Sequence, residues 1–142
     1  MGVTFFFYGT LTDPDVLASV VGRSVPAADR RRACLDGYRR VARDGASYPI
    51  LVPDPAARVD GVLVSGLDAR DRIRLQRFEG PDYWVDRLSV QGPGGRAVTA
   101  CVFMPQPWVR GSAEPWDLAT WRRRHKRRYI ARLRAFGMCD PD

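Results

Sequence analysis

Two short segments far apart in the chain hold the residues best suited to chemistry. One is Y-G-T-L (Tyr8–Leu11), at the end of an apolar run, and the other is F-E-G-P-D-Y (Phe78–Tyr83), just before a strand-like run. The first predicts a backbone cradle for a small polar ligand, because glycine lets a ligand approach the main chain and free N–H groups at a helix start favour a carboxylate or a polarised carbonyl. On its own, however, this tetrapeptide is better explained as a plain strand-to-helix turn. The chain has neither glycine-rich pattern of a phosphate loop.

Glu79 is the main candidate for acid–base chemistry, since the chain has only one other glutamate, Glu114. It stands beside the aromatic residues Phe78 and Tyr83. A carboxylate among apolar rings loses solvation, which raises its pKa and suits it to general-base work near neutral pH. A surface glutamate in a helix-to-strand turn explains the pattern equally well. Glu114, beside Pro115, is expected to interact with the dipole at the start of a helix.

Other kinds of site are not favoured by the residues available. His125 is the only histidine, and we expect it to be a core or interface residue of an amphipathic helix. The cysteines Cys34, Cys101 and Cys139 lack metal-type spacing, so no metal site is expected. The first two lie in strand-like runs and are expected to be small core residues. The chain has no G-x-S-x-G elbow for a serine triad.

Length and charge limit the possible classes of protein. The 142 residues predict one domain, 1–142, and the formal charge of +7 permits a nucleic-acid partner. Much of that charge lies in 122–128, however, and aromatic residues are not interleaved with it, so a solvated helix face is expected instead. No apolar run reaches the roughly 18 residues of a membrane span. We therefore expect a cytoplasmic protein without a membrane partner. Nucleic-acid binding through 122–128 stays as the less favoured alternative, and the oligomeric state stays open.

Hydrophobic periodicity and turn residues predict the elements that must position these side chains. The expected strands are 3–8, 33–41, 48–52, 59–67, 83–90 and 96–104, with P-D-P (53–55) ending the third of them. The expected helices are one capped by Thr12 or Asp13 and closed by Gly22, one over 69–78 capped by Asp68, and a basic amphipathic helix over about 116–136. The apolar face of the last helix holds Leu118, Trp121, His125, Tyr129, Leu133 and Phe136.

The order of these elements indicates the fold class. Strands and helices do not alternate regularly, which argues against a parallel α/β sheet. We predict an α+β domain, a small mixed and mostly antiparallel β-barrel, closed or nearly closed, with flanking helices.

Together these segments resemble the gamma-glutamylcyclotransferase-like family, including its AIG2-like and gamma-glutamylamine cyclotransferase branches. The order and spacing of the matching pieces span nearly the whole chain. They are F-F-Y-G-T-L (6–11), Y-P (48–49), V-D-G-V-L (59–63), L-Q-R-F-E-G-P-D-Y (75–83) and W-D-L-A-T-W (116–121). The resemblance implies a small barrel flanked by helices, with a pocket at one end.

The resemblance also implies what the pocket does. In the family the Y-G-x-L segment grips the substrate and the glutamate of the E-G segment is the acid/base, which makes Glu79 catalytic here. The implied reaction converts a small γ-glutamyl substrate to 5-oxoproline and an amine, without a metal or organic cofactor. Substrate contacts are implied for Tyr8, Gly9, Thr10, Leu11 and Tyr83.

Two departures from the family pattern leave the substrate open. Gln76 stands where many relatives carry aspartate, and the arginine that relatives place near the tyrosine comes later here, at Arg87. The leaving amine is a side-chain amine, a peptide or the intermediate of a biosynthetic tailoring pathway. A non-catalytic small-molecule binding module of the same fold is the alternative to an enzyme.

Overall fold

Strands and helices account for most of residues 2–135, the part of the chain that the computed structural model describes. Phe136 and Cys139 lie outside these residues. The strands are β1 (Val3–Phe7), β2 (Arg30–Arg43), β3 (Pro49–Leu67), β4 (Tyr83–Gln91), β5 (Ala97–Pro105) and β6 (Gly111–Pro115). The α-helices are α1 (Pro14–Val21), α2 (Ala69–Glu79), α3 (Leu118–Arg124) and α4 (Lys126–Ala135).

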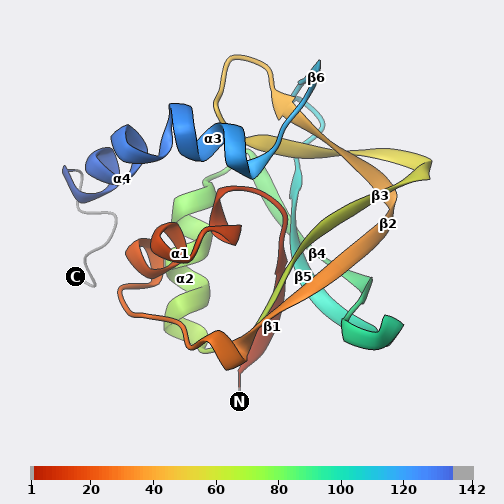
Figure 1. Ribbon diagram of the computed structural model, residues 1–142, viewed down its shortest axis with the longest axis horizontal. Helices are drawn as coiled ribbons and strands as arrows, with labels where there is room; N and C mark the ends of the chain where they lie inside the picture. Colours follow the sequence, from red (N-terminus) through yellow and green to blue (C-terminus); the bar gives the residue numbers. More distant parts are fainter. Residues whose placement is uncertain (1, 136–142) are drawn as a thin grey trace.

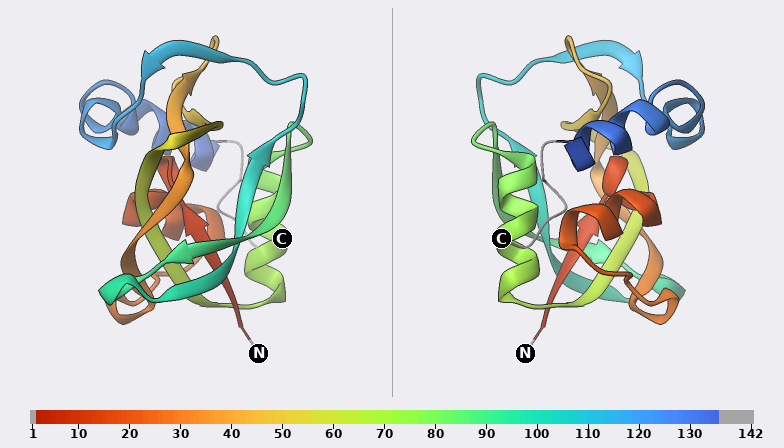
Figure 2. Two further views of the ribbon diagram at one scale, coloured as in Figure 1. Left: turned by 90° about the vertical axis from the view of Figure 1, so that its right-hand side faces the viewer. Right: turned by 90° about the vertical axis from the view of Figure 1, so that its left-hand side faces the viewer.

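Five strands form a closed barrel, which confirms the predicted fold class. They follow the order β3-β1-β5-β4-β2, and β2 also pairs with β3 and so closes the circle (Figure 1). The pairs are antiparallel except for β1 with β5. Strand β6 extends β2 at the outer edge. The four α-helices gather on one side of the barrel and cover it there (Figure 2).

Strand β1 separates two apolar cores, because successive side chains of a strand point to opposite faces. Phe6 and Tyr8 belong to the core inside the barrel. Phe5 and Phe7 belong to the core between the barrel and the helices. Both faces of β1 are apolar because the strand lies between these two cores.

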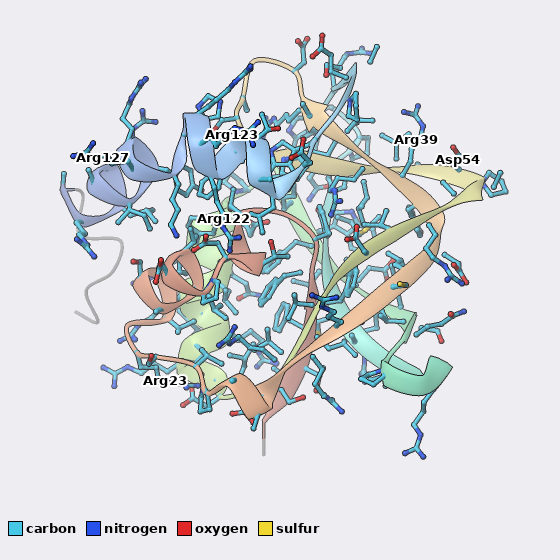
Figure 3. The ribbon with its side chains drawn as sticks, viewed as in Figure 1. Arg23, Arg39, Asp54, Arg122, Arg123 and Arg127 are labelled. Carbon is cyan, nitrogen blue, oxygen red and sulfur yellow. The ribbon has the colours of Figure 1, made fainter. Side chains whose placement is uncertain are left out.

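The prediction that P-D-P ends a strand was wrong, since β3 runs from residue 49 to 67 without interruption. The ladder with β2 pairs Tyr38 with Pro53 and next Asp36 with Arg58, so the residues between 53 and 58 bulge out of register. Proline lacks an N–H group and is tolerated where a ladder is interrupted in this way. At this projecting tip Asp54 lies near Arg39, with 3.7 Å between the carboxylate and Nε (Figure 3).

The single helix predicted over 116–136 is two helices. The main chain leaves the helical region at His125, whose φ is −129°, so α3 ends and α4 begins there. His125 is exposed, which corrects its assignment to the apolar face. Glu114 lies in β6, which pairs with β2, and not at the start of a helix as expected. The cap of α3 is Asp117, whose side chain accepts a hydrogen bond from the Thr120 N–H at 2.8 Å.

The first two α-helices begin and end close to where the sequence signals place them. The Asp13 side chain accepts from the amides of Asp15 and Val16, and Gly22 ends α1 in the left-handed conformation. Asp68 and Asp71 form a reciprocal capping box at the start of α2. These signals are local, so the surrounding fold does not override them.

Asp13 also fastens the C-terminal helices to the rest of the domain. Its side chain is fully buried, and its Oδ2 lies 2.7 Å from Nε of Arg122 and 3.0 Å from Nζ of Lys126. Figure 3 shows Arg122 between α3 and α1. Burial raises the pKa of Asp13, but the hydrogen bonds from Arg122 and Lys126 outweigh this effect and hold the pKa below its ordinary value. The ionised form is therefore the stable one near neutral pH.

Replacing Asp13 with asparagine separates its two roles, because asparagine still caps a helix but carries no charge. We expect Asp13→Asn to lower the free energy of unfolding by about 2 kcal/mol at pH 7, since it leaves two cations without their buried partner. Asp13→Ala should cost about 1 kcal/mol more through the lost cap. Urea unfolding measures both. The control is Asp15→Asn, which removes an exposed partner of Lys126; equal stability of Asp13→Asn and this control would contradict the assignment.

Candidate active site

A cavity of about 420 Å³ opens where β1 and α2 end, β3 and β4 begin, and α4 passes over the barrel. Its volume lies in the lower part of the range typical of small-molecule sites. All six residues that the sequence proposes for the site line this one cavity. They are Tyr8, Gly9, Thr10, Leu11, Glu79 and Tyr83.

The sequence suggested that the Y-G-T-L segment leads directly into an α-helix, but the structure differs. The segment enters a 3-10 turn, η1 (Thr10–Thr12), and α1 starts only after it. Because the Asp13 side chain caps α1, the amides that face the cavity belong to the turn. The first amides of such a turn have no partner within it and can serve a ligand.

Gly9 is required by the close approach of two chain segments. A Cβ atom at this position would lie 3.0 Å from both Cγ and Cδ of Pro49, which is tighter than ordinary carbon contacts. Pro49 begins β3 and also lines the cavity. The glycine therefore lets the η1 turn and the start of β3 share one wall.

Tyr8 supports the cavity wall through a buried hydrogen bond. Its hydroxyl donates to the carbonyl oxygen of Phe103 in β5 at 2.6 Å. Its own carbonyl oxygen accepts from Nη1 of Arg40 at 2.9 Å. Burial, followed by the nearby charge of Glu79, raises the pKa of Tyr8 well above its ordinary value, so the phenol stays neutral. Tyr8 thus positions β1 against β5 beside the cavity.

Glu79 is the last residue of α2, and Gly80 ends the helix with a positive φ of 78°. This abrupt end leaves the carboxylate in the cavity beside Phe78, Phe103 and Leu133, which also line it. Burial alone raises the pKa of Glu79 from 4.5 to about 8. A carboxyl group with this pKa exchanges its proton readily near neutral pH.

The Tyr83 hydroxyl is buried and has no hydrogen-bond partner among residues 2–135. Burial, followed by the charge of Glu79, raises its pKa, and the neighbouring Arg43 guanidinium lowers it by a smaller amount. Behind it, the Arg43 guanidinium lies 5.9 Å from the ring centroids of both Tyr83 and Tyr48. Arg43 in turn donates to Asp82 at 2.8 Å. These contacts hold the Tyr83 ring while its hydroxyl is left for a further partner.

Nine further residues line the cavity without having been identified as part of a site. They include Tyr48, Phe103, Tyr129 and Arg132. Tyr129 was expected on the apolar face of a helix, and its ring does pack edge-on against Phe78 and Trp121, with centroids 6.2 and 5.3 Å away. The spacing of Arg132 from Tyr129 could have indicated that both side chains face the same cavity, because residues three apart lie on one face of a helix.

The described residues offer little for other kinds of site. Among residues 2–135, no three His, Cys, Asp or Glu side chains are grouped so that they could hold a metal ion. Cys34 and Cys101 are free, half-buried thiols in β2 and β5. Cys101 packs against the core between the barrel and the helices, as expected of a small core residue. In the same part of the chain, no helix combines the length and apolar character needed to cross a bilayer.

Comparisons with known proteins agree with the fold. AIG2-like protein A of Arabidopsis thaliana is 26% identical over 142 residues, covering 94% of this chain and 81% of that protein. A solution structure from the same plant matches with a TM-score of 0.68 at 24% identity, over 96% of this chain and 82% of that one. A structure of a gamma-glutamyl cyclotransferase matches with a TM-score of 0.66 at 13% identity, over 95% and 88% of the two chains.

The family assignment rests on sequence over most of the chain. The model of the family described as gamma-glutamyl cyclotransferase, AIG2-like, matches residues 5–123. This range includes the Y-G-T-L segment and Glu79. The two structural matches show the shared fold independently. The chain therefore belongs to the gamma-glutamyl cyclotransferase, AIG2-like family.

Proposed function

We propose that this protein is a γ-glutamyl cyclotransferase-type enzyme that releases 5-oxoproline and an amine, with Glu79 as its acid and base. The observation that carries the proposal is a glutamate whose pKa burial raises to about 8, inside a cavity walled by Tyr8, Tyr83 and the Gly9 turn. Perturbed carboxyl groups in clefts are typical of acid–base catalysts. The family of the chain gives the reaction class.

The pKa of Glu79 suits the proton transfers of this reaction. The α-ammonium group of a γ-glutamyl substrate has a pKa of about 8 to 10 by analogy with protein amines. Proton transfer between groups of similar pKa costs little free energy. Glu79 takes one proton from the ammonium, and the freed amine attacks the γ-carbonyl carbon of the same molecule. When the bond from that carbon to the leaving amine breaks, Glu79 returns the proton to the leaving nitrogen. The ring nitrogen releases its second surplus proton to solvent, which leaves a neutral lactam.

The ring closure needs positioning more than it needs a strong catalyst. Attack within one molecule already has a large entropic advantage, so the cavity must only hold the substrate in its ring-closing shape. The amides of the η1 turn and the unpartnered Tyr83 hydroxyl are the polar groups available for this task. We assign them to the substrate carboxylate or to the oxyanion of the tetrahedral intermediate.

Release of 5-oxoproline tests the proposal directly. A panel of γ-glutamyl amino acids, γ-glutamyl amines and glutathione is incubated with wild type, Glu79→Gln and Glu114→Gln. Glu114, the only other glutamate of the chain, is exposed in β6 and makes a matched control. We expect Glu79→Gln to lower kcat by about 10² or more and Glu114→Gln to leave it unchanged. Full turnover by Glu79→Gln would remove Glu79 from the mechanism, and ligand binding without turnover by wild type would favour a binding module.

The raised pKa also predicts how stability depends on pH. The folded protein holds the Glu79 proton more tightly than the unfolded chain, so the resulting stability is complete below about pH 4.5 and is lost as the pH rises to about 8. Glu79→Gln carries no such proton. We expect it to unfold at the same urea concentration as wild type near pH 4.5 and to be more stable, on the order of a few kcal/mol, at pH 9. A difference that does not change with pH would contradict the raised pKa.

The Tyr83 hydroxyl gives a test of substrate contact. Tyr83→Phe removes a buried hydroxyl without a protein partner, so stability should be kept or slightly increased. If the hydroxyl binds the substrate, kcat/KM falls by about tenfold, the value of one hydrogen bond to a charged group. Thermal unfolding and the 5-oxoproline assay measure the two effects. Lower stability with unchanged kcat/KM would show that the hydroxyl is structural.

A further inference from the structure

Besides the carboxyl group of Glu79, the cavity holds one cationic side chain. Of the fifteen residues that line it, Glu79 is the only carboxylic acid and Arg132 the only strong base. Arg132 comes from α4 and is exposed, whereas Glu79 is partly buried at the end of α2. Arg132 therefore lies at the solvent side of the cavity and Glu79 on its inner side.

The position of Arg132 is fixed by its neighbours on α4. Tyr129, three residues earlier, shares a helix face with Arg132. Leu133 follows Arg132 in the chain, and both Tyr129 and Leu133 pack in the core between the barrel and the helices. Burial raises the pKa of Tyr129; among smaller effects, the charge of Glu79 also raises it and that of Arg132 lowers it. Tyr129 lines the same cavity as Glu79 and Arg132.

Among residues 2–135, Arg132 is the only arginine or lysine that lines the cavity. Like Arg134 and other arginines of α4, it has no carboxylate partner in this part of the chain. Arg23, Arg122 and Lys126 pair with the carboxylates of Asp71, Asp13 and Asp15. No carboxylate among residues 2–135 lies within 4 Å of the Arg132 guanidinium. An arginine at the edge of a small-molecule cavity presents a planar donor fork that matches a carboxylate.

On the basis of the proposed function, we propose that Arg132 binds a carboxylate of the leaving group, so that the substrates are γ-glutamyl amino acids or short γ-glutamyl peptides. The substrate's own α-carboxylate sits on the same carbon as the α-ammonium group, which must reach Glu79. That end is therefore held on the inner side of the cavity. The γ-amide and the leaving group extend the other way, toward the solvent side where Arg132 lies.

A matched pair of substrates isolates this contact. γ-Glutamylglycine and γ-glutamylmethylamine differ by a single carboxylate on the leaving group and share the α-carboxylate. The variants are Arg132→Gln, Arg132→Lys and the control Arg134→Gln, which changes an arginine of the same helix that lines a separate groove against α1. The measured quantities are kcat/KM for 5-oxoproline release by each variant, and Kd for each compound on Glu79→Gln with and without the arginine change.

We expect wild type to prefer γ-glutamylglycine by about tenfold or more, the value of hydrogen bonds between charged groups. Arg132→Gln should abolish this preference by lowering kcat/KM for γ-glutamylglycine alone, Arg132→Lys should restore part of it, and Arg134→Gln should leave both substrates unchanged. Equal loss for both compounds would place Arg132 at the shared α-carboxylate and overturn the inference. Loss for neither would overturn it as well.

The binding measurement separates this inference from the proposed function. If wild type releases 5-oxoproline from both compounds without discrimination, and Arg132→Gln changes neither Kd, the enzyme assignment holds and the role of Arg132 is wrong. If neither compound is turned over, while Arg132→Gln still weakens the binding of γ-glutamylglycine alone, the enzyme assignment fails and the carboxylate contact stands.

Discussion

The buried carboxylate of Asp13 is the interaction on which the layout of the site depends. It caps α1 and at the same time holds Arg122 and Lys126, which belong to α3 and to the start of α4. A buried carboxylate left without its cations is costly, so the three helices are bound to one arrangement. That arrangement lays α4 over the end of the barrel, where it provides one wall of the cavity.

The chemistry of Glu79 follows from this packing. With Tyr129 and Leu133 of α4 above it and aromatic rings from β1 and β5 beside it, the carboxylate loses much of its hydration. The cost of that loss appears as the raised pKa of Glu79, so the properties that suit the proposed acid–base role lower the stability of the fold above about pH 4.5. The barrel core, with Phe6, Leu63 and Val102 fully buried, supplies the rigidity that sustains it.

The sequence predicted best what depends on neighbouring residues and worst what depends on distant ones. The caps Asp13 and Asp68 specify their helices locally, and the order of the elements predicted the barrel. The resemblance to the family singled out the six residues that line one cavity. Strand β3 continues past its prolines because it bulges against β2, whose residues there are not adjacent in sequence. Strand β6 forms where Gly111 packs closely against Val41, which is far more distant in sequence. No glycine or proline marks the break at His125.

The most direct test of the account is a titration of Glu79 itself. Because the chain has only two glutamates, protein labelled with ¹³C in the glutamate side-chain carboxyl gives two signals, and Glu114→Gln assigns them. The account predicts that the remaining signal titrates near pH 8, as burial requires, and that a bound γ-glutamyl ligand shifts it. A Glu79 signal that titrates near pH 4.5 and ignores the ligand would show a solvated, uninvolved carboxylate and contradict the central claim.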